Sequence, residues 1–206
     1  DAAAGQAEPA AWTQVELAKL ALARGRLERA ERHLSAALTL LPGYVYAHEQ
    51  QARLEAARGR IRAALRRARL AADAVPLPQF VSLLADLYER AGNRRAARQQ
   101  VATVGAIGRL LQANGIRTDV ESVVLDADHR LGLRTLVARA RAARAARPSI
   151  LGDDALAWAL ARAGRCAEAR TWSQRSLRLG TRDALLFFHR AEIERCAGNP
   201  AGARTW

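Results

Sequence analysis

Residues 17–42 read LAKLALARGRLERAERHLSAALTLLP, in which Gly25 separates two alanine- and leucine-rich segments and Pro42 closes the second. Glycine permits a tight turn between helices, and proline ends a helix and turns the chain. Here and elsewhere, β-branched residues rarely alternate over more than a few positions, so strands are not indicated. The stretch predicts a pair of helices joined by a short turn.

The same arrangement repeats along the chain. Six glycines lie in similar surroundings at intervals of 34, 33, 40, 32 and 34 residues: Gly25, Gly59, Gly92, Gly132, Gly164 and Gly198. A period of about 34 residues is typical of helix-turn-helix solenoids. Five of the glycines have an alanine seven residues before them and another five residues after: Ala18, Ala52, Ala85, Ala157 and Ala191, then Ala30, Ala64, Ala97, Ala169 and Ala203. Small side chains there let two helices cross closely. The Gly132 repeat differs from this pattern, because Leu125 and Val137 occupy the two alanine positions.

This pattern resembles the tetratricopeptide repeat. The first repeat matches it at Leu17, Ala18, Gly25, Ala30, Leu34, Ala37 and Pro42. Residues 154–169, DALAWALARAGRCAEA, followed by LGTRD at 179–183, are similar to a variant common in high-GC, actinobacterial-like bacteria. The resemblance covers about residues 11–206. It implies an all-α, right-handed superhelical solenoid of antiparallel helix pairs, with about six repeats and the last one truncated.

We expect a flexible lead-in over 1–9 and a single helical repeat domain over 10–206, with a weak divide near 115. Gly105 and Gly108 could kink or end the long helix of the third pair, and Thr118 with Glu121 reads as a capping box that starts the next helix. The expected helix pairs are 10–24 with 27–40, 44–58 with 60–74, 77–91 with 94–113, 118–131 with 133–146, 149–163 with 165–179, and 182–197 with 200–206.

The two ends suggest that the sequence is part of a longer chain. Methionine is absent, so Asp1 is not expected to be a native start. Asn199 and Pro200 read as the cap and first turn of a new helix, which stops at Trp206 before it can cover a partner. We therefore expect the natural protein to continue, and self-association through the truncated last repeat is an alternative use of that end.

The net charge of +13 comes almost wholly from arginine, since Lys19 is the only lysine. Nucleic-acid or anionic-surface binding through arginine-rich second helices is therefore an alternative function. The arginines circle each helix, however, and no aromatic residues interleave with them for base stacking, so nucleic acid is disfavoured. The residues concerned are Arg60, Arg62, Arg66, Arg67 and Arg69, and Arg134, Arg139, Arg141, Arg144 and Arg147.

No motif predicts an enzyme, a metal site or a cofactor. His48 and Glu49 resemble the start of a zinc-protease motif, but Ala52 occupies the position of the second ligand. Asp126, Asp128 and His129 lie close in sequence, yet the two aspartates fall on different helix faces, which favours solvated or arginine-paired carboxylates. Gly105 and Gly108 lack the strand and third glycine of a phosphate-binding loop.

By the resemblance, the first helix of each pair lines a concave groove that binds a peptide or protein partner. The chain is then a non-enzymatic protein-interaction scaffold. The asparagines of the chaperone-binding clamp are absent and only Lys19 remains, so that specialised function is disfavoured. An unused groove, or one that packs on a missing repeat, stays open. The groove candidates are Trp12, Lys19, Tyr46, Arg53, Asp86, Arg90, Asp126, His129, Arg130, Trp158, Arg162, Phe188 and Arg195.

The two cysteines fall at helix ends in neighbouring repeats. Cys166 opens a second helix and Cys196 closes the next first helix, so antiparallel stacking brings both to one rim of the solenoid. A disulfide and two buried free thiols are both consistent with this placement, and a disulfide would favour an oxidising compartment. The longest apolar runs are too short to span a membrane. The resemblance to bacterial repeat proteins, many of them exported, favours an extracytoplasmic over a cytoplasmic location.

Overall fold

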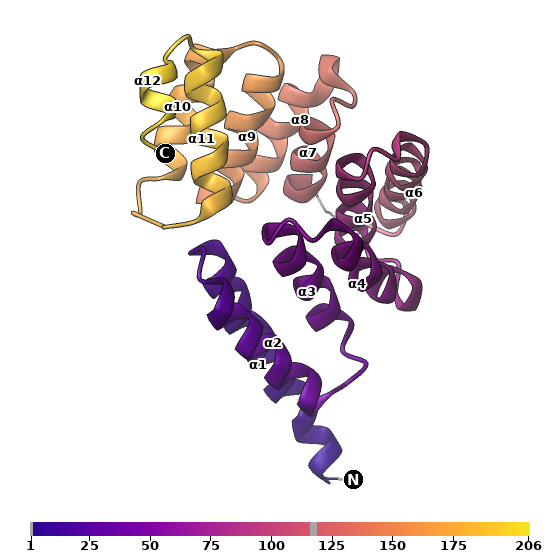
Figure 1. The fold of residues 1–206 in the computed structure, drawn as a ribbon. Helices are drawn as coiled ribbons and strands as arrows, with labels where there is room; N and C mark the ends of the chain where they lie inside the picture. The colour runs from indigo at the N-terminus through magenta and orange to yellow at the C-terminus, as the bar shows by residue number, and fades with distance from the viewer. Residues whose placement is uncertain (1, 116–118) are drawn as a thin grey trace. The chain divides into compact units, whose positions relative to one another are not determined.

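The computed structural model describes residues 2–115 and 119–206, and every regular element in these ranges is an α-helix (Figure 1). The helices follow one another as antiparallel pairs joined by short turns, as the repeat pattern predicts. They are α1 (Ala2–Ala23), α2 (Leu27–Leu40), α3 (Val45–Ala57), α4 (Ile61–Ala74), α5 (Pro78–Arg90), α6 (Arg94–Ala113), α7 (Asp119–Asp128), α8 (Leu133–Ala146), α9 (Ile150–Arg162), α10 (Cys166–Ser176), α11 (Ala184–Cys196) and α12 (Pro200–Ala203).

Five of the six repeat glycines lie just after the first helix of their pair, whereas Gly132 is the N-cap of α8 and Arg130 has a positive φ after α7. Gly59 and Gly164 have left-handed backbones, with φ of +75° and +77°. After α9, the Gly164 amide donates to the carbonyl of Ala161 and the Arg165 amide to that of Leu160. This pair of bonds satisfies carbonyls that the helix end would leave unpaired, and it needs a residue that tolerates positive φ. The recurrence of glycine at these positions is therefore explained by the backbone conformation of the turns.

The alanines that flank each glycine lie where the paired helices cross. Ala52 of α3 and Ala64 of α4 have no exposed surface, and Ala157 of α9 and Ala169 of α10 are equally buried. Among the ten predicted crossing alanines, Ala191 alone is only half-buried. The prediction that methyl-sized side chains set these contacts is confirmed for the other nine.

The chain divides into two compact units. Unit 1 is Asp1–Arg109 and holds α1 to α5 with most of α6; unit 2 is Leu110–Trp206 and holds α7 to α12. Unit 1 has apolar clusters around Val15 and Leu34 and around Leu84 and Leu87. Unit 2 has one cluster formed by α7, α8, α9, α10 and α11, with Leu136, Leu156, Leu160 and Ile193 at its centre. The single domain predicted over 10–206 stays a prediction.

The predicted helix boundaries agree with the structure to within a few residues, α6 included, and the clear difference is the start of the first helix. Helix α1 begins at Ala2, so residues 2–9 belong to the first helix, and the expected start at residue 10 is wrong. Helix α6 is continuous through Gly105 and Gly108, so neither glycine ends it. Helix α12 has only four residues, and Asn199 caps it by accepting from the Gly202 amide at 3.0 Å. Thr118 of the expected capping box lies outside the described residues.

Candidate functional site

The groove candidates of unit 1 lie on α1, α3 and α5 without forming one cluster. Tyr46 packs edge-to-face on Phe80, with ring centroids 5.5 Å apart. Arg53 donates to the buried carboxylate of Glu49 on the same helix. Lys19 pairs with a nearby glutamate on α1, and Trp12, Asp86 and Arg90 are exposed. The structure therefore does not bring these side chains to a common point.

Unit 2 gathers its candidates around Trp158 of α9. The Trp158 side chain is only 5% exposed, and its Nε1 donates to Asp128 Oδ1 of α7 at 2.7 Å. The indole stacks on the His189 ring of α11, with centroids 4.4 Å apart and planes 13° apart. Phe188 lies 6.2 Å from the indole and is 53% exposed. We call Asp128, Asp154, Trp158, Arg162, Phe188 and His189 the α7–α9–α11 cluster.

Arg162 of α9 ties the end of α7 to this cluster. Its guanidinium lies 5.1 Å from the centre of the Trp158 ring, which suits a cation–π contact. Its Nε donates to the Ala127 carbonyl at 2.9 Å and its Nη2 to the Asp128 carbonyl at 3.3 Å. These carbonyls lie at the C-terminus of α7, where a cation is favourable. Burial, followed by the charge of Arg130, lowers the pKa of Arg162.

A buried acid–imidazole pair completes the cluster. His189 Nδ1 lies 2.8 Å from Asp154 Oδ2, and both side chains are almost wholly buried. The contact with the Asp154 carboxylate holds the imidazole ring in one orientation. The other two polar atoms, His189 Nε2 and Asp154 Oδ1, have no hydrogen-bond partner within the described part of the chain. Because the His189 ring stacks on the Trp158 indole and is held by Asp154, the pair fixes the position of that indole.

The remaining unit 2 candidates have separate partners. Asp126 pairs with Arg139 of α8 at 2.6 Å, which agrees with the arginine-paired interpretation of that residue. Arg195 pairs with Glu192 on α11. Arg130 is exposed just after α7, with φ of +55°, and His129 beside it is half-buried and engaged. Of the predicted residues, the structure therefore brings together Trp158, Arg162 and Phe188.

Sequence reasoning missed the residues that hold Trp158 in place. Asp128 lies 30 residues before Trp158, and His189 lies 35 residues after Asp154, both close to one repeat period. Residues one period apart occupy equivalent sites on neighbouring repeats, so a spacing of about one period is the sequence signal for such contacts. The spacing alone does not show which pairs of residues make contact.

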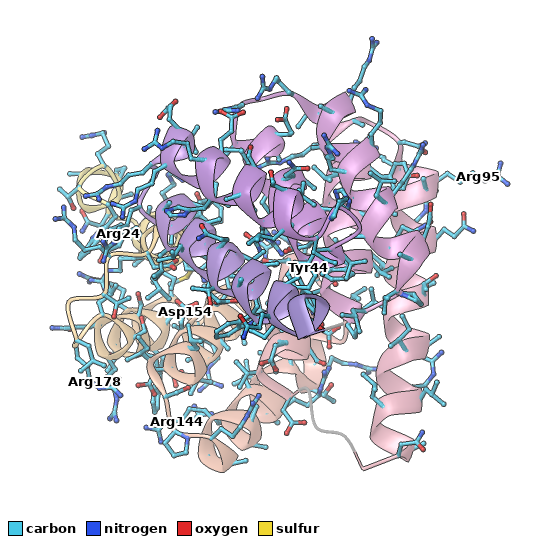
Figure 2. The ribbon with its side chains drawn as sticks, turned by 90° about the horizontal axis from the view of Figure 1, so that it is seen from below. Arg24, Tyr44, Arg95, Arg144, Asp154 and Arg178 are labelled. Carbon is cyan, nitrogen blue, oxygen red and sulfur yellow. A yellow bond between two sulfur atoms is a disulfide. The ribbon has the colours of Figure 1, made fainter. Side chains whose placement is uncertain are left out.

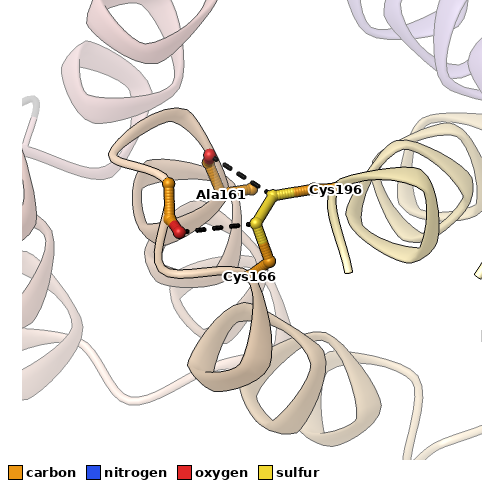
Figure 3. Close-up of a disulfide and its surroundings, with 4 residues drawn as sticks. Ala161, Cys166 and Cys196 are labelled. Atoms are coloured by element: carbon orange, nitrogen blue, oxygen red, sulfur yellow. Dashed lines mark hydrogen bonds between the residues drawn. A yellow bond between two sulfur atoms is a disulfide. The ribbon is translucent and has the colours of Figure 1, made fainter. Parts of the chain in front are cut away.

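A disulfide joins α10 and α11 of unit 2. Cys166 is the first residue of α10 and Cys196 the last residue of α11, and their Cα atoms are 5.5 Å apart (Figure 3). The sulfur of Cys196 lies 3.8 Å from the Ala161 carbonyl oxygen, and that of Cys166 lies 3.5 Å from the Gly164 carbonyl oxygen. The bond links the turn of one repeat to the end of the first helix of the next.

Buried carboxylates engage arginines of unit 2. Asp153, with no exposed surface, accepts from Arg144 of α8 at 2.9 Å and from Arg178 at 2.6 Å, two residues labelled in Figure 2. Glu194 of α11 is also buried; burial opposes its ionisation, but a hydrogen bond from Asn199 and the charges of Arg190 and Arg170 outweigh it and lower the Glu194 pKa. These arginines contribute to the fold and are not free to bind anions.

Neither a metal centre nor a membrane span emerges from the described residues. They contain no group of three or more histidine, cysteine, aspartate or glutamate side chains able to hold a metal ion. None of their helices combines the length and apolarity needed to cross a bilayer.

Comparisons with known proteins identify the fold. No protein-family model matches the sequence, and no curated protein sequence matches it. Solved structures of tetratricopeptide repeat proteins do match. The APC/C hetero-tetramer Cut9–Hcn1 gives a TM-score of 0.56 at 17% identity over 95% of this chain and 38% of that chain. Pseudomonas aeruginosa pilF gives 0.51 at 14% identity over 97% of this chain and 90% of its own. A tetratricopeptide repeat protein from Parabacteroides merdae gives 0.46 at 17% identity over 96% and 77%. At such identities the likeness shows the fold alone.

Proposed function

From the tetratricopeptide-repeat fold of this chain, we propose that it is a non-enzymatic protein-interaction scaffold that binds a peptide or protein segment on the α7–α9–α11 cluster. The observation that carries this proposal is the exposed Phe188 side chain, which lies against the buried Trp158 ring that Arg162 also contacts. Helical repeats present such faces to other proteins. Fold alone does not assign function, so the proposal rests on this site.

Phe188 has the features of an interface anchor. Its ring is 53% exposed, while the adjacent Trp158 and His189 rings are buried and oriented by Asp128 and Asp154. An aromatic side chain on a rigid base loses little conformational entropy when a partner covers it. Aromatic and arginine residues also dominate the binding energy of protein interfaces. We therefore expect the partner to bury the Phe188 side chain at the centre of the interface.

The charges around Phe188 favour an extended or helical segment with mixed polarity. The exposed Arg130 and the partly exposed Arg162 lie at the α7 side of the cluster, and the Glu192–Arg195 pair lies further along α11. Charges at the rim of an interface set orientation and association rate more than affinity. They would orient the segment while Phe188 supplies most of the affinity.

A site-specific crosslinking experiment tests the proposal. A photoreactive phenylalanine analogue is placed at residue 188 in the full chain, and the control carries it at Gln174, which is exposed on α10, a second helix of the repeats. We expect a discrete crosslinked protein from position 188 and not from 174, and we expect Phe188→Ala to weaken binding of that protein by about tenfold. Equal crosslinking at both positions, or binding unchanged in Phe188→Ala, would exclude this face.

The alternative, nucleic-acid or anionic-surface binding through the second helices, has less support in unit 2. There Arg139, Arg141 and Arg147 pair with Asp126, Glu168 and Glu121, at 2.6, 3.2 and 3.1 Å. A phosphate would have to displace these carboxylates. Self-association through the last repeat stays a prediction that sedimentation analysis can test.

A further inference from the structure

Helix α4 of unit 1 carries an arginine patch whose charges no carboxylate of the described residues neutralises. The patch consists of Arg62, Arg66, Arg67 and Arg69, and Asp73 is the only acidic residue on the helix. Arg62, Arg66 and Arg67 make no ion pair or hydrogen bond with any described residue. Four positive charges on two turns of helix repel one another unless something anionic lies against them.

Arg69 is oriented by its neighbour and not by a carboxylate. Its Nε and Nη2 lie 3.1 and 2.7 Å from the Tyr88 hydroxyl of α5, and its guanidinium lies 5.5 Å from the centre of the Tyr88 ring. These contacts fix the side chain and leave its charge uncompensated. The half-buried His48 of α3 also experiences the patch, because desolvation and then the charge of Arg67 lower its pKa.

The arginines border a surface cavity with an apolar wall. Arg66, Arg67 and Arg69 line it together with Ala63, Leu70 and Glu55. Leu70 is 51% exposed. The Glu55 carboxylate is already paired with Arg60 at 2.6 Å, so it does not neutralise the patch. The cavity therefore combines unpaired cations with an exposed aliphatic side chain.

This combination differs from a nucleic-acid surface. Stacking aromatics are the usual companions of arginines that bind single strands, and the Tyr88 ring beside this patch is already covered by Arg69. The position of Leu70 suits an apolar side chain of a protein partner.

We propose that this α4 surface binds an acidic segment of a partner protein, with carboxylates facing Arg62, Arg66 and Arg69 and an apolar residue on Leu70. The three arginines are spaced i, i+4 and i+7, so they form one row of about 10 Å along the helix. A helical segment with glutamates at the same spacing matches that row, and arginine pairs well with carboxylates. The surface is separate from the α7–α9–α11 cluster, and the proposal stands without the function proposed there.

The test is a fluorescence-anisotropy titration of the full chain. The probe is a labelled helical peptide with glutamates at i, i+4 and i+7 and one leucine, and its control has glutamine at the three positions. We expect saturable binding of the glutamate peptide alone. Arg62→Gln/Arg66→Gln should weaken it about fivefold, because each exposed arginine–carboxylate pair contributes modestly. Peptide binding should also protect Arg62 and Arg66 of the unmodified chain from phenylglyoxal.

A matched variant separates this site from general positive charge. Arg94 and Arg95 of α6 are exposed in the same unit, and Figure 2 shows Arg95 extending away from its helix. Arg94→Gln/Arg95→Gln removes the same charge and should leave peptide affinity nearly unchanged. Equal losses in both double variants would overturn the proposal, as would tighter binding of polyuridylate than of the peptide at the same salt, or no difference between the glutamate and glutamine peptides.

Discussion

Replacing both cysteines by serine should strongly destabilise unit 2. The Cys166–Cys196 bond spans 30 residues of sequence. In the chain-entropy model, closing a loop of that length removes about 12 cal/mol/K from the unfolded state, which is about 3.6 kcal/mol at 25 °C. Cys196 is exposed and Cys166 half-buried, so the serine hydroxyls add little desolvation cost. For a unit of this size, such a loss is a large part of the total stability.

Urea unfolding followed by tryptophan fluorescence measures this change. Three of the four tryptophans, Trp158, Trp172 and Trp206, lie in unit 2, so the signal mainly reports that unit. With an m-value of about 1–2 kcal/mol/M, the midpoint should fall by about 2–4 M. Reduction should lower the wild-type midpoint to that of the double serine variant, and should leave the variant unchanged.

The entropy argument would be refuted by a double serine variant that unfolds at the same urea concentration as the oxidised wild type. The thiol count is the necessary control: iodoacetamide should label two cysteines of the wild type only after reduction. If the wild type labels before reduction, the bond is absent and the comparison reports only the serine substitutions.

Three further predictions concern stability. Ala157→Leu should lower the stability of unit 2 by about 1–3 kcal/mol through overpacking, whereas Ala191→Leu, at the half-buried position, should cost less in the same thermal melts. Gly164→Ala should cost about 1–2 kcal/mol because φ is +77° there, while Gly108→Ala inside α6 should be neutral or stabilising. The Glu194 pKa is lowered in the folded state, so its contribution is complete above the unfolded value and is lost as pH falls through the folded value; Glu194→Gln should flatten the acid limb of the melting temperature against pH.

The parts of the structure that sequence predicted well are those with a local cause. A short turn at the end of a helix needs a residue with a left-handed backbone. Glycines such as Gly59 and Gly164 therefore mark the turns in the sequence. A close helix crossing tolerates only a methyl group, so Ala52 and Ala157 identify the packed faces. These constraints act within about ten residues and are legible in one sequence.

The candidate site was predicted less completely because its contacts lie between repeats. The sequence predicts that Trp158 faces a partner. In the structure its side chain is buried, because it contacts Asp128 and His189 of the neighbouring repeats. Helical spacing assigns a residue to a face without giving its burial there. The ion pairs of Asp153 depend in the same way on arginines of α8 and of the segment after α10. The helical start at Ala2 was missed because the first nine residues include Gly5 and Pro9, which usually disfavour a helix interior, yet α1 continues through Pro9.

The bonds of Arg162 have a consequence for how unit 2 opens. A repeat array behaves as a row of elements whose cooperativity is set by nearest-neighbour coupling. Arg162 of α9 holds the last carbonyls of α7, and the disulfide holds α10 to α11, so each boundary between neighbouring repeats in unit 2 carries a specific link besides apolar contact. Unfolding that starts at one terminal repeat would have to break one of these links before it could spread to the next repeat. The amide hydrogens of α7, α9 and α11 should therefore exchange as one group, with a single opening free energy, and not in succession from the terminus.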